Sequence, residues 1–147
     1  MFLIEKGTTL TFDKITEIIQ QFNTRDRVRL QKYFDYYSGK QEIMMKRKVS
    51  DGKPCNRVVT NYALNIVNNY QGYLTGKDIS YSSVQEFEKI QDTLNYNDVQ
   101  QADSELLRNA LIYGVAYEIC YIDEDKQQRF KVLDSRNCIP IYENALD

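Results

Sequence analysis

The chain has 147 residues, a formal net charge of −2, 42% apolar residues and 27% charged residues. A chain of this length can bury roughly 70% of its unfolded surface, which favours one compact domain and excludes a disordered charged tail. It contains no histidine, which excludes histidine-dependent triads, proton shuttles and histidine-ligated metal sites within the chain. No apolar run approaches the ~20 residues of a membrane span, so we expect a soluble protein without a standard export signal.

Tyrosine and cysteine usage indicates the setting of the protein rather than its chemistry. Twelve tyrosines with no tryptophan suit half-buried positions and interfaces, but we expect most of them to replace Phe and Leu in the core. Cys55, Cys120 and Cys138 are widely spaced and form no CxxC pair. They predict reduced thiols in a bacterial or cytoplasmic setting rather than a disulfide framework.

Two helices are predicted in the first 40 residues. The first begins after Thr11, which can cap it, and Leu10 can pack on Ile15. Its apolar face consists of Phe12, Ile15, Ile18, Ile19 and Phe22. The second helix spans 25–38 and ends at Gly39, as helices often end at glycine. Its apolar face consists of Leu30, Tyr33, Phe34 and Tyr37.

An exposed loop is predicted over 40–57, because this segment has no hydrophobic period and contains the turn string SDGKP. A third helix is predicted from near Val58. One side carries Val59, Tyr62, Ala63, Ile66, Tyr70 and Tyr73, and the other carries Asn61, Asn65, Asn68 and Asn69. Gly72 and Gly76 then let the chain leave the helix and turn into a short strand over Asp78–Ser82.

Two further helices are predicted before residue 114. The segment Ser83–Glu86 has the form of a capping box and opens the fourth helix. Its inward residues are Val84, Phe87, Ile90 and Leu94. The fifth helix follows Asp98. Its aligned apolar residues are Val99, Ala102, Leu106, Ala110 and Tyr113.

The hydrophobic period then changes from helical to two. Val115, Tyr117, Ile119 and Tyr121 alternate with Ala116, Glu118, Cys120 and Ile122. A turn over Asp123–Lys126 and the alternation of Phe130 and Val132 predict a β-hairpin. A last strand is predicted near Ile139–Tyr142, where Pro140 marks an edge. The predicted fold class is therefore α+β, mainly helical at first with about five helices, with a small antiparallel hairpin sheet near the C-terminus.

The stretch GYLTGKD, Gly72–Asp78, superficially resembles a phosphate-binding loop. A Walker A loop has the form G-x-x-x-x-G-K-[ST], follows a strand and holds Mg²⁺ through the hydroxyl after its lysine. This stretch is one residue short, follows a helix, and has Asp78 where the hydroxyl belongs. A structural corner between a helix and a strand is therefore the preferred interpretation.

No catalytic, cofactor-binding or metal-ligating residue is predicted. The turn Asp123–Asp125 lacks the further ligand, the central glycine and the distal glutamate of an EF-hand. Glu86 and Glu88 lie two apart on a helix and therefore diverge. Glu118 lies within an apolar strand, where a buried functional carboxylate is one interpretation and a residue facing solvent or an interface is the commoner one. Ser–Lys chemistry has no supporting motif.

Charge is distributed unevenly along the sequence. Residues 25–57 carry ten Lys/Arg against four Asp/Glu, whereas 78–125 carry two against eleven. This asymmetry has three interpretations: a nucleic-acid face on the first half, head-to-tail assembly of basic on acidic faces, or two solvated surfaces. Charge alone favours the last.

The order of the motifs resembles the N-terminal part of the portal proteins of long-tailed bacteriophages that infect Gram-positive bacteria. The resemblance covers about residues 33–143, and each motif is short, so their shared order and spacing carry it. The matching residues are Tyr36–Ile43, Asn56–Arg57, Gly72–Tyr73, Gly76–Lys77, Glu105–Leu106, Ala110, Tyr113–Gly114, Ala116–Glu118, Asp123–Asp125 and Ile141–Glu143. Cys55, where the family often has asparagine, is a departure.

The resemblance implies a structural protein that performs no covalent chemistry and needs no cofactor. It implies a homo-oligomeric ring at the capsid vertex, through which double-stranded DNA passes, with terminase, scaffold or capsid and head–tail connector proteins as partners. No membrane and no small-molecule substrate are implied. The location would be the virion, and the host cytoplasm during assembly.

Family members are several times longer than this chain, so we expect 1–147 to be a single portal-wing-like domain from the N-terminal part of a longer protein. Its expected parts are a helical arm (1–24), a basic helix and loop (25–57), and a helix and hairpin core (58–147). A small stand-alone phage adaptor or DNA-binding module is the alternative, suggested by the basic segment. A nucleotide-dependent enzyme, which rests only on GYLTGK, is the least favoured.

Overall fold

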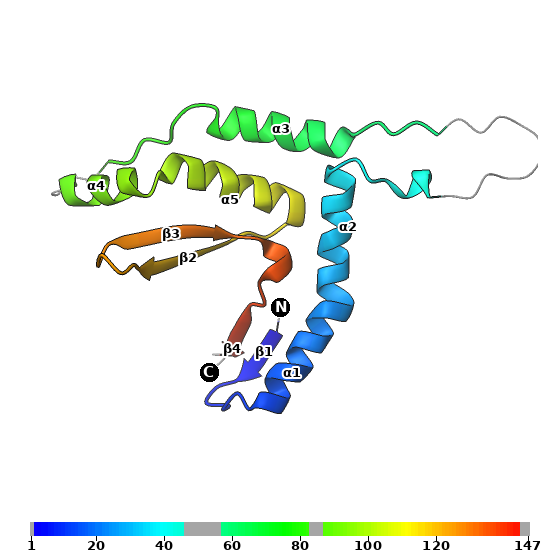
Figure 1. The fold of residues 1–147 in the computed structure, drawn as a ribbon, viewed down its shortest axis with the longest axis horizontal. Coiled ribbons are helices and arrows are strands. Elements are labelled where there is room, and N and C mark those ends of the chain that lie inside the picture. The colour runs from blue at the N-terminus through cyan, green and yellow to red at the C-terminus, as the bar shows by residue number, and fades with distance from the viewer. Residues whose placement is uncertain (1, 46–56, 83–86, 145–147) are drawn as a thin grey trace, which may run out of the picture.

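A computed structural model describes residues 2–45, 57–82 and 87–144. A long helical rod runs along one side of the molecule, and two helices and a hairpin lie in layers beside its end (Figure 1). The chain termini meet in a small two-stranded sheet near the other end of the rod. The α+β class is confirmed. The predicted capping box at 83–86, Val84, Glu86 and Cys55 lie outside the described residues.

The rod consists of α1 (Phe12–Gln21), a π-helical turn (Phe22–Asp26) and α2 (Arg27–Tyr37). Thr11 caps α1 as predicted, because its Oγ1 accepts a hydrogen bond from the Lys14 amide at 3.4 Å. The two predicted helices are joined without a break. Neither proline nor glycine interrupts the junction, and the Thr24 hydroxyl bonds back to the Gln20 carbonyl at 2.9 Å.

Gly39 ends the rod as predicted, with φ of 83°. Its amide donates to the Tyr36 carbonyl at 3.2 Å, and the Lys40 amide donates to the Asp35 carbonyl at 2.7 Å. These two bonds form a Schellman motif, which satisfies carbonyls that the helix leaves unpaired. The chain therefore turns sharply away from α2, and a short 3₁₀ turn (Glu42–Met44) follows.

The third helix, α3 (Tyr62–Thr75), begins four residues later than predicted. Asn61 was assigned to a polar side but is the cap: its Oδ1 accepts from the Leu64 amide at 3.2 Å. Its Nδ2 donates to the Tyr37 carbonyl at 2.9 Å. One side chain thus starts α3 and attaches it to the end of α2.

The predicted strand over Asp78–Ser82 is wrong, since the described residues 76–82 contain no strand. The segment lies beside the helix that contains Gln100, and no neighbouring strand pairs with it. Instead, the Gln100 side-chain amide bonds both the amide and the carbonyl of Ile79, at 2.8 and 2.6 Å. A single glutamine therefore satisfies both backbone groups of Ile79, which a neighbouring strand would otherwise have paired.

Helices α4 (Glu88–Tyr96) and α5 (Val99–Tyr113) follow, and Asn97 joins them to the hairpin. The Asn97 Nδ2 donates to the Gln128 carbonyl at 2.8 Å, and its Oδ1 accepts from the Phe130 amide at 3.0 Å. The fifth helix begins after Asp98 as predicted. In α4, Ile90 is exposed rather than inward, because only the end of this helix lies against α5 and the hairpin.

The predicted hairpin is confirmed as β2 (Tyr117–Ile122) and β3 (Gln128–Leu133), paired antiparallel with Cys120 opposite Phe130. Its turn is held by Asp123, whose amide donates to the Gln127 carbonyl and whose carboxylate accepts from the Gln127 amide, at 2.9 and 2.8 Å. Strand β3 lies against α5, so α3, α5 and the hairpin form three successive layers (Figure 1).

The last strand, β4 (Ile141–Asn144), begins two residues later than predicted and pairs in parallel with β1 (Phe2–Glu5), which was not predicted. Pro140 lies just before β4, and its carbonyl accepts from the Phe2 amide at 3.3 Å. Because each strand of a two-stranded sheet has a free edge, the edge assignment suits both strands.

The core is small and lies where the rod, α5 and the terminal sheet converge. Phe22, Leu30 and Tyr113 form its buried cluster, with Phe2 and Ile139 packed against it. Beyond it the predicted apolar faces of α1 and α2 run out into solvent. The exposed members are Phe12, Ile15, Ile19 and Tyr33.

Arg136 connects α2 to the segment between β3 and β4. Its Nη2 and Nε bond the Asp134 carboxylate at 2.6 and 3.0 Å, and its Nη1 donates to Gln31 Oε1 at 3.1 Å. The guanidinium also lies 4.2 Å from the centre of the Phe34 ring. Hydrogen bonds from Arg136 hold the pKa of Asp134 below its usual value. This arginine therefore links the rod to the segment that follows the hairpin.

Candidate assembly surface

Helix α3 packs through one side only. Val67 is buried on that side, and the Gln71 amide donates to the Ser104 hydroxyl of α5 at 2.9 Å. The opposite side carries large side chains that are more than half exposed. These are Tyr62 (67%), Ile66 (56%), Tyr70 (56%) and Tyr73 (87%). The expectation that most tyrosines occupy the core is therefore wrong for this helix.

The exposed side of α3 lacks the charges that a solvated helix normally carries. No Asp, Glu, Lys or Arg occurs anywhere in Tyr62–Thr75. At about 200 Å² per fully exposed tyrosine, the three tyrosines alone present roughly 400 Å². Contiguous patches of this size, rich in tyrosine and poor in charge, are typical of protein–protein interfaces.

The hairpin has a second bare face, on the side away from α5. Helix α5 contacts β3, where Phe130 and Val132 are half-buried, whereas Ile122 of β2, on the same face of the sheet, is 74% exposed. On the outward face, opposite to Phe130 and Val132, Ile119 and Tyr121 of β2 are 46% and 45% exposed, and Arg129 opposite Tyr121 lies 4.2 Å from the centre of the Tyr96 ring of α4. An isolated two-stranded hairpin is marginally stable in water, so a hairpin that α5 contacts through β3 leaves a surface on β2 suited to further packing.

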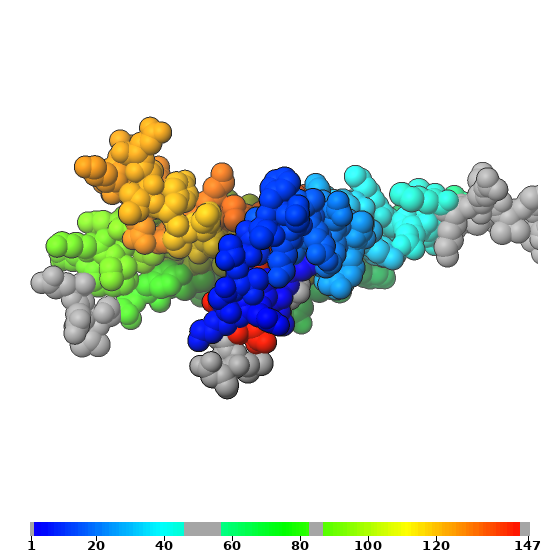
Figure 2. Space-filling model, turned by 90° about the horizontal axis from the view of Figure 1, so that it is seen from below, coloured from blue at the N-terminus to red at the C-terminus, as the bar shows by residue number. Residues whose placement is uncertain are grey.

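Helix α4 and the hairpin turn lie at the same end of the molecule (Figure 2), and both carry acidic side chains. The exposed ones are Glu88, Asp92, Asp98, Glu124 and Asp125. Basic residues line the rod, from the π-helical turn into α2. Of these, Arg25 and Arg29 hold the buried Asp26 carboxylate at 3.3 and 3.1 Å. The basic segment predicted over 25–57 extends into 46–56, outside the described residues.

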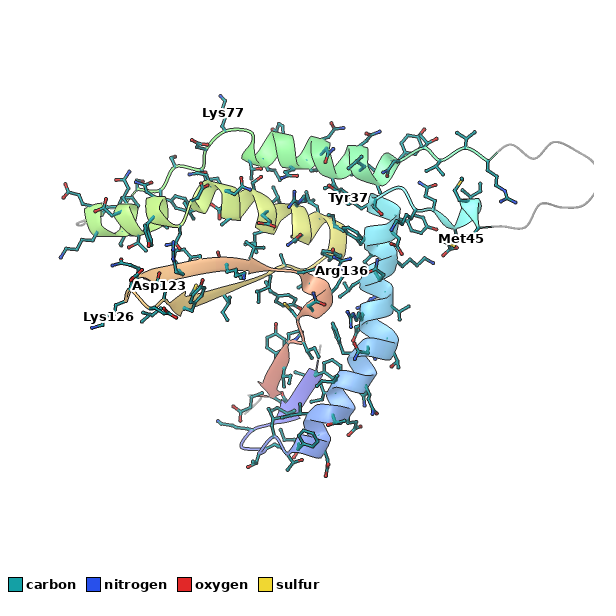
Figure 3. The ribbon with its side chains drawn as sticks, viewed as in Figure 1. Tyr37, Met45, Lys77, Asp123, Lys126 and Arg136 are labelled. Carbon is teal, nitrogen blue, oxygen red and sulfur yellow. The ribbon has the colours of Figure 1, made fainter. Side chains whose placement is uncertain are left out.

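The GYLTGKD stretch does not form a phosphate-binding loop. Gly72 lies inside α3, and Gly76 follows its last turn, where an added Cβ would lie 2.1 Å from the Gly72 carbonyl oxygen. No helix begins at this corner, and the Lys77 side chain points away from the body of the molecule (Figure 3). The stretch is a structural corner, as interpreted, although it leads into an extended segment rather than a strand.

The carboxylates considered from the sequence do not converge. Glu118 is exposed on β2, and Glu88 lies in the first turn of α4. Asp123 accepts from Arg129 Nε at 3.0 Å, which makes it part of the hairpin turn. Among the described residues, no group of three or more Cys, Asp or Glu side chains is placed to hold a metal ion.

A comparison with protein families assigns the chain to a family. The family model described as phage portal protein, SPP1 Gp6-like, matches residues 16–147, which is most of the chain. The chain belongs to this portal protein family. The resemblance inferred from the motifs is thereby confirmed. A search of curated proteins found no match.

The sequence predicted which residues share the apolar side of α3, but no interface was predicted from them. These side chains were grouped correctly, but their exposure was not foreseen. The available signal was the absence of charge across fourteen consecutive helical residues, which fits a buried helix or an interface. The structure shows that this side of the helix is not buried within the chain. None of the helices in the described segments is long and apolar enough to span a membrane.

Proposed function

We propose that this portal chain is a structural subunit of a homo-oligomeric ring at a capsid vertex. Double-stranded DNA enters and leaves through the ring, and terminase, scaffold or capsid and head–tail connector proteins dock on it. The subunit performs no covalent chemistry and requires no cofactor. It resides in the virion, and in the host cytoplasm during assembly. Residues 1–147 act as one portal-wing-like domain with the three parts expected from the sequence.

The family match carries this proposal, and the surface supports it. A protein that works as a monomer gains nothing from exposing tyrosine and isoleucine on an uncharged helix. A ring subunit must bury such faces against its neighbours. The small core fits the same role, because contacts between subunits can supply stability that the isolated chain lacks.

Electron microscopy of the purified complete gene product tests the proposal. We expect closed rings, and mass photometry should show one high-mass species at micromolar concentration. The salt concentration should be varied, because charged surfaces influence assembly. A product that remains monomeric across all salt conditions would contradict the ring.

The absence of nucleotide chemistry is tested separately. Titration of ATP with Mg²⁺ into the protein should produce no binding heat, and Lys77→Ala should behave as the unchanged protein does. Binding that disappears in Lys77→Ala would contradict the structural role and restore the phosphate-binding interpretation of Gly72–Asp78.

A further inference from the structure

The two bare faces lie on the two outer layers of the molecule. Helix α3 forms one outer layer, the hairpin forms the other, and α5 lies between them (Figure 1). We propose that the uncharged side of α3 in one copy packs on the outward face of the β2–β3 hairpin in the neighbouring copy. This contact rests on the proposed ring and names the surfaces that build it.

Each face is covered by a second copy of the chain, because the hairpin needs a covering layer and the uncharged side of α3 can provide one. A ring is built from heterologous contacts, which join two different patches of the same chain. The hairpin lacks a layer on its outward face, and a helix is a standard cover for a sheet face. Helix α3 presents roughly 400 Å² from its tyrosines alone, about half of what each partner contributes to a standard interface. Ile66 and the hairpin residues Ile119 and Tyr121 add to this area.

Charge supports the same alignment. Lys77 follows the C-terminal end of α3, and the hairpin turn projects toward the same end of the layers (Figure 3). Within the described residues, Lys77, Glu124 and Asp125 form no ion pair with one another or with other side chains. Copies stacked in the same orientation therefore bring Lys77 toward the acidic turn of the neighbour. Lys131, on the outward hairpin face, can extend its stem along the contact and keep its ammonium at the rim.

Cysteine cross-linking tests the contact in the complete gene product. All native cysteines, among them Cys55, Cys120 and Cys138, are replaced by serine, and Ile66→Cys is combined with Ile119→Cys. Within one copy these positions lie on opposite sides of α5, so a disulfide between them can form only between copies. Mild oxidation should then give a ladder of covalent multimers on a non-reducing gel. Each single-cysteine variant can give a dimer at most.

The matched control combines Ile66→Cys with Val28→Cys, a position on α2 that is more exposed than Ile119, and should give no ladder. Rings that remain visible by electron microscopy while the Ile66/Ile119 variant gives no ladder would overturn the contact and leave the proposed function standing. An unchanged gene product that forms no rings, together with an Ile66/Ile119 variant that gives no ladder, would overturn both.

A charge exchange provides a measurement that does not depend on cysteine chemistry. Lys77→Glu should raise the protein concentration required for half-maximal assembly by roughly two- to five-fold at low salt, as expected for an exposed ion pair. Combining it with Glu124→Lys and Asp125→Lys should restore assembly. A combined variant that assembles no better than Lys77→Glu would overturn the proposed alignment.

Discussion

Replacement of Arg136 by alanine should loosen the joint between the rod and the layers. The change removes the hydrogen bonds to Asp134 and Gln31 and the stacking of the guanidinium on Phe34, which lies 4.2 Å from the ring centre. The ion pair is partly exposed, at 24% for Arg136 and 34% for Asp134. It should therefore contribute about 1 kcal/mol rather than the value of a buried pair.

The stacking contact adds about 1 kcal/mol, and the lost packing of the arginine stem adds a similar amount. We expect Arg136→Ala to lower the free energy of unfolding by about 2–3 kcal/mol in total. For a domain of this size, that loss corresponds to a decrease in Tm of roughly 5–10 °C. Arg136→Lys should recover little of it, because lysine cannot form the bidentate pair or stack as a plane.

Urea unfolding followed by circular dichroism measures this effect. Arg108→Ala is the control, because its ion pair with Glu105 is long, at 3.5 Å, and exposed. The control should cost less than about 0.5 kcal/mol. The pKa of Asp134 is lowered from 3.8 by Arg136, so this ion pair contributes fully above pH 4 and is lost as the pH falls through the lowered pKa. Equal costs for Arg136→Ala and Arg108→Ala at pH 7 would refute the reasoning.

Three further predictions concern single side chains. Gly39→Ala should cost about 1 kcal/mol in urea unfolding, because φ of 83° strains any residue with a Cβ. Ser135→Ala should cost about 1–2 kcal/mol by the same assay, since it leaves the Val115 carbonyl without its 2.8 Å hydrogen bond from a fully buried hydroxyl. A hydrogen bond to Asp103 raises the pKa of Tyr81 from 10.0 to about 12, so the stability that it contributes is full below pH 10 and is lost between about pH 10 and 12. Absorbance at 295 nm of the protein and of Tyr81→Phe should differ by a tyrosinate signal that appears near pH 12.

Each of these has a distinct failing outcome. Gly7 also has a positive φ but lies in open space near the chain terminus, so Gly39→Ala should cost at least as much as Gly7→Ala. A Ser135→Ala variant as stable as the parent would mean that the Val115 carbonyl finds water. If the tyrosinate signal that Tyr81→Phe removes instead titrates near pH 10, the hydrogen bond to Asp103 does not raise the pKa of Tyr81.

Local signals predicted the parts of the fold that depend on near neighbours. The cap at Thr11, the helix end at Gly39 and the hairpin turn at Asp123 each involve hydrogen bonds between residues at most five apart. Such geometry follows from residue type and spacing. Asn61 shows the limit, because its capping role depends on an extended segment before it, and its second bond reaches the Tyr37 carbonyl.

Pairing between segments that are distant in the chain could not be predicted from the sequence. Strand β1 is four residues long, and its partner β4 comes from the other end of the chain, so neither period nor turn chemistry indicates the pair. The extended segment at Ile79 has the composition of a strand, but Gln100 satisfies its backbone groups instead of a neighbouring strand. In both cases the deciding partner is distant in sequence.

The exposed side of α3 shows a different limit. The rule that an apolar helix side faces the core assumes that the chain buries its own apolar residues. Tyr62, Ile66, Tyr70 and Tyr73 break that assumption, and they do so on a helix whose packed side uses the polar contact between Gln71 and Ser104. A helix that buries Val67 beside a polar contact and presents four larger apolar and aromatic side chains outward is suited to a partner outside the chain. The rule that an apolar helix side faces the core therefore fails at the same residues from which we infer the subunit contact.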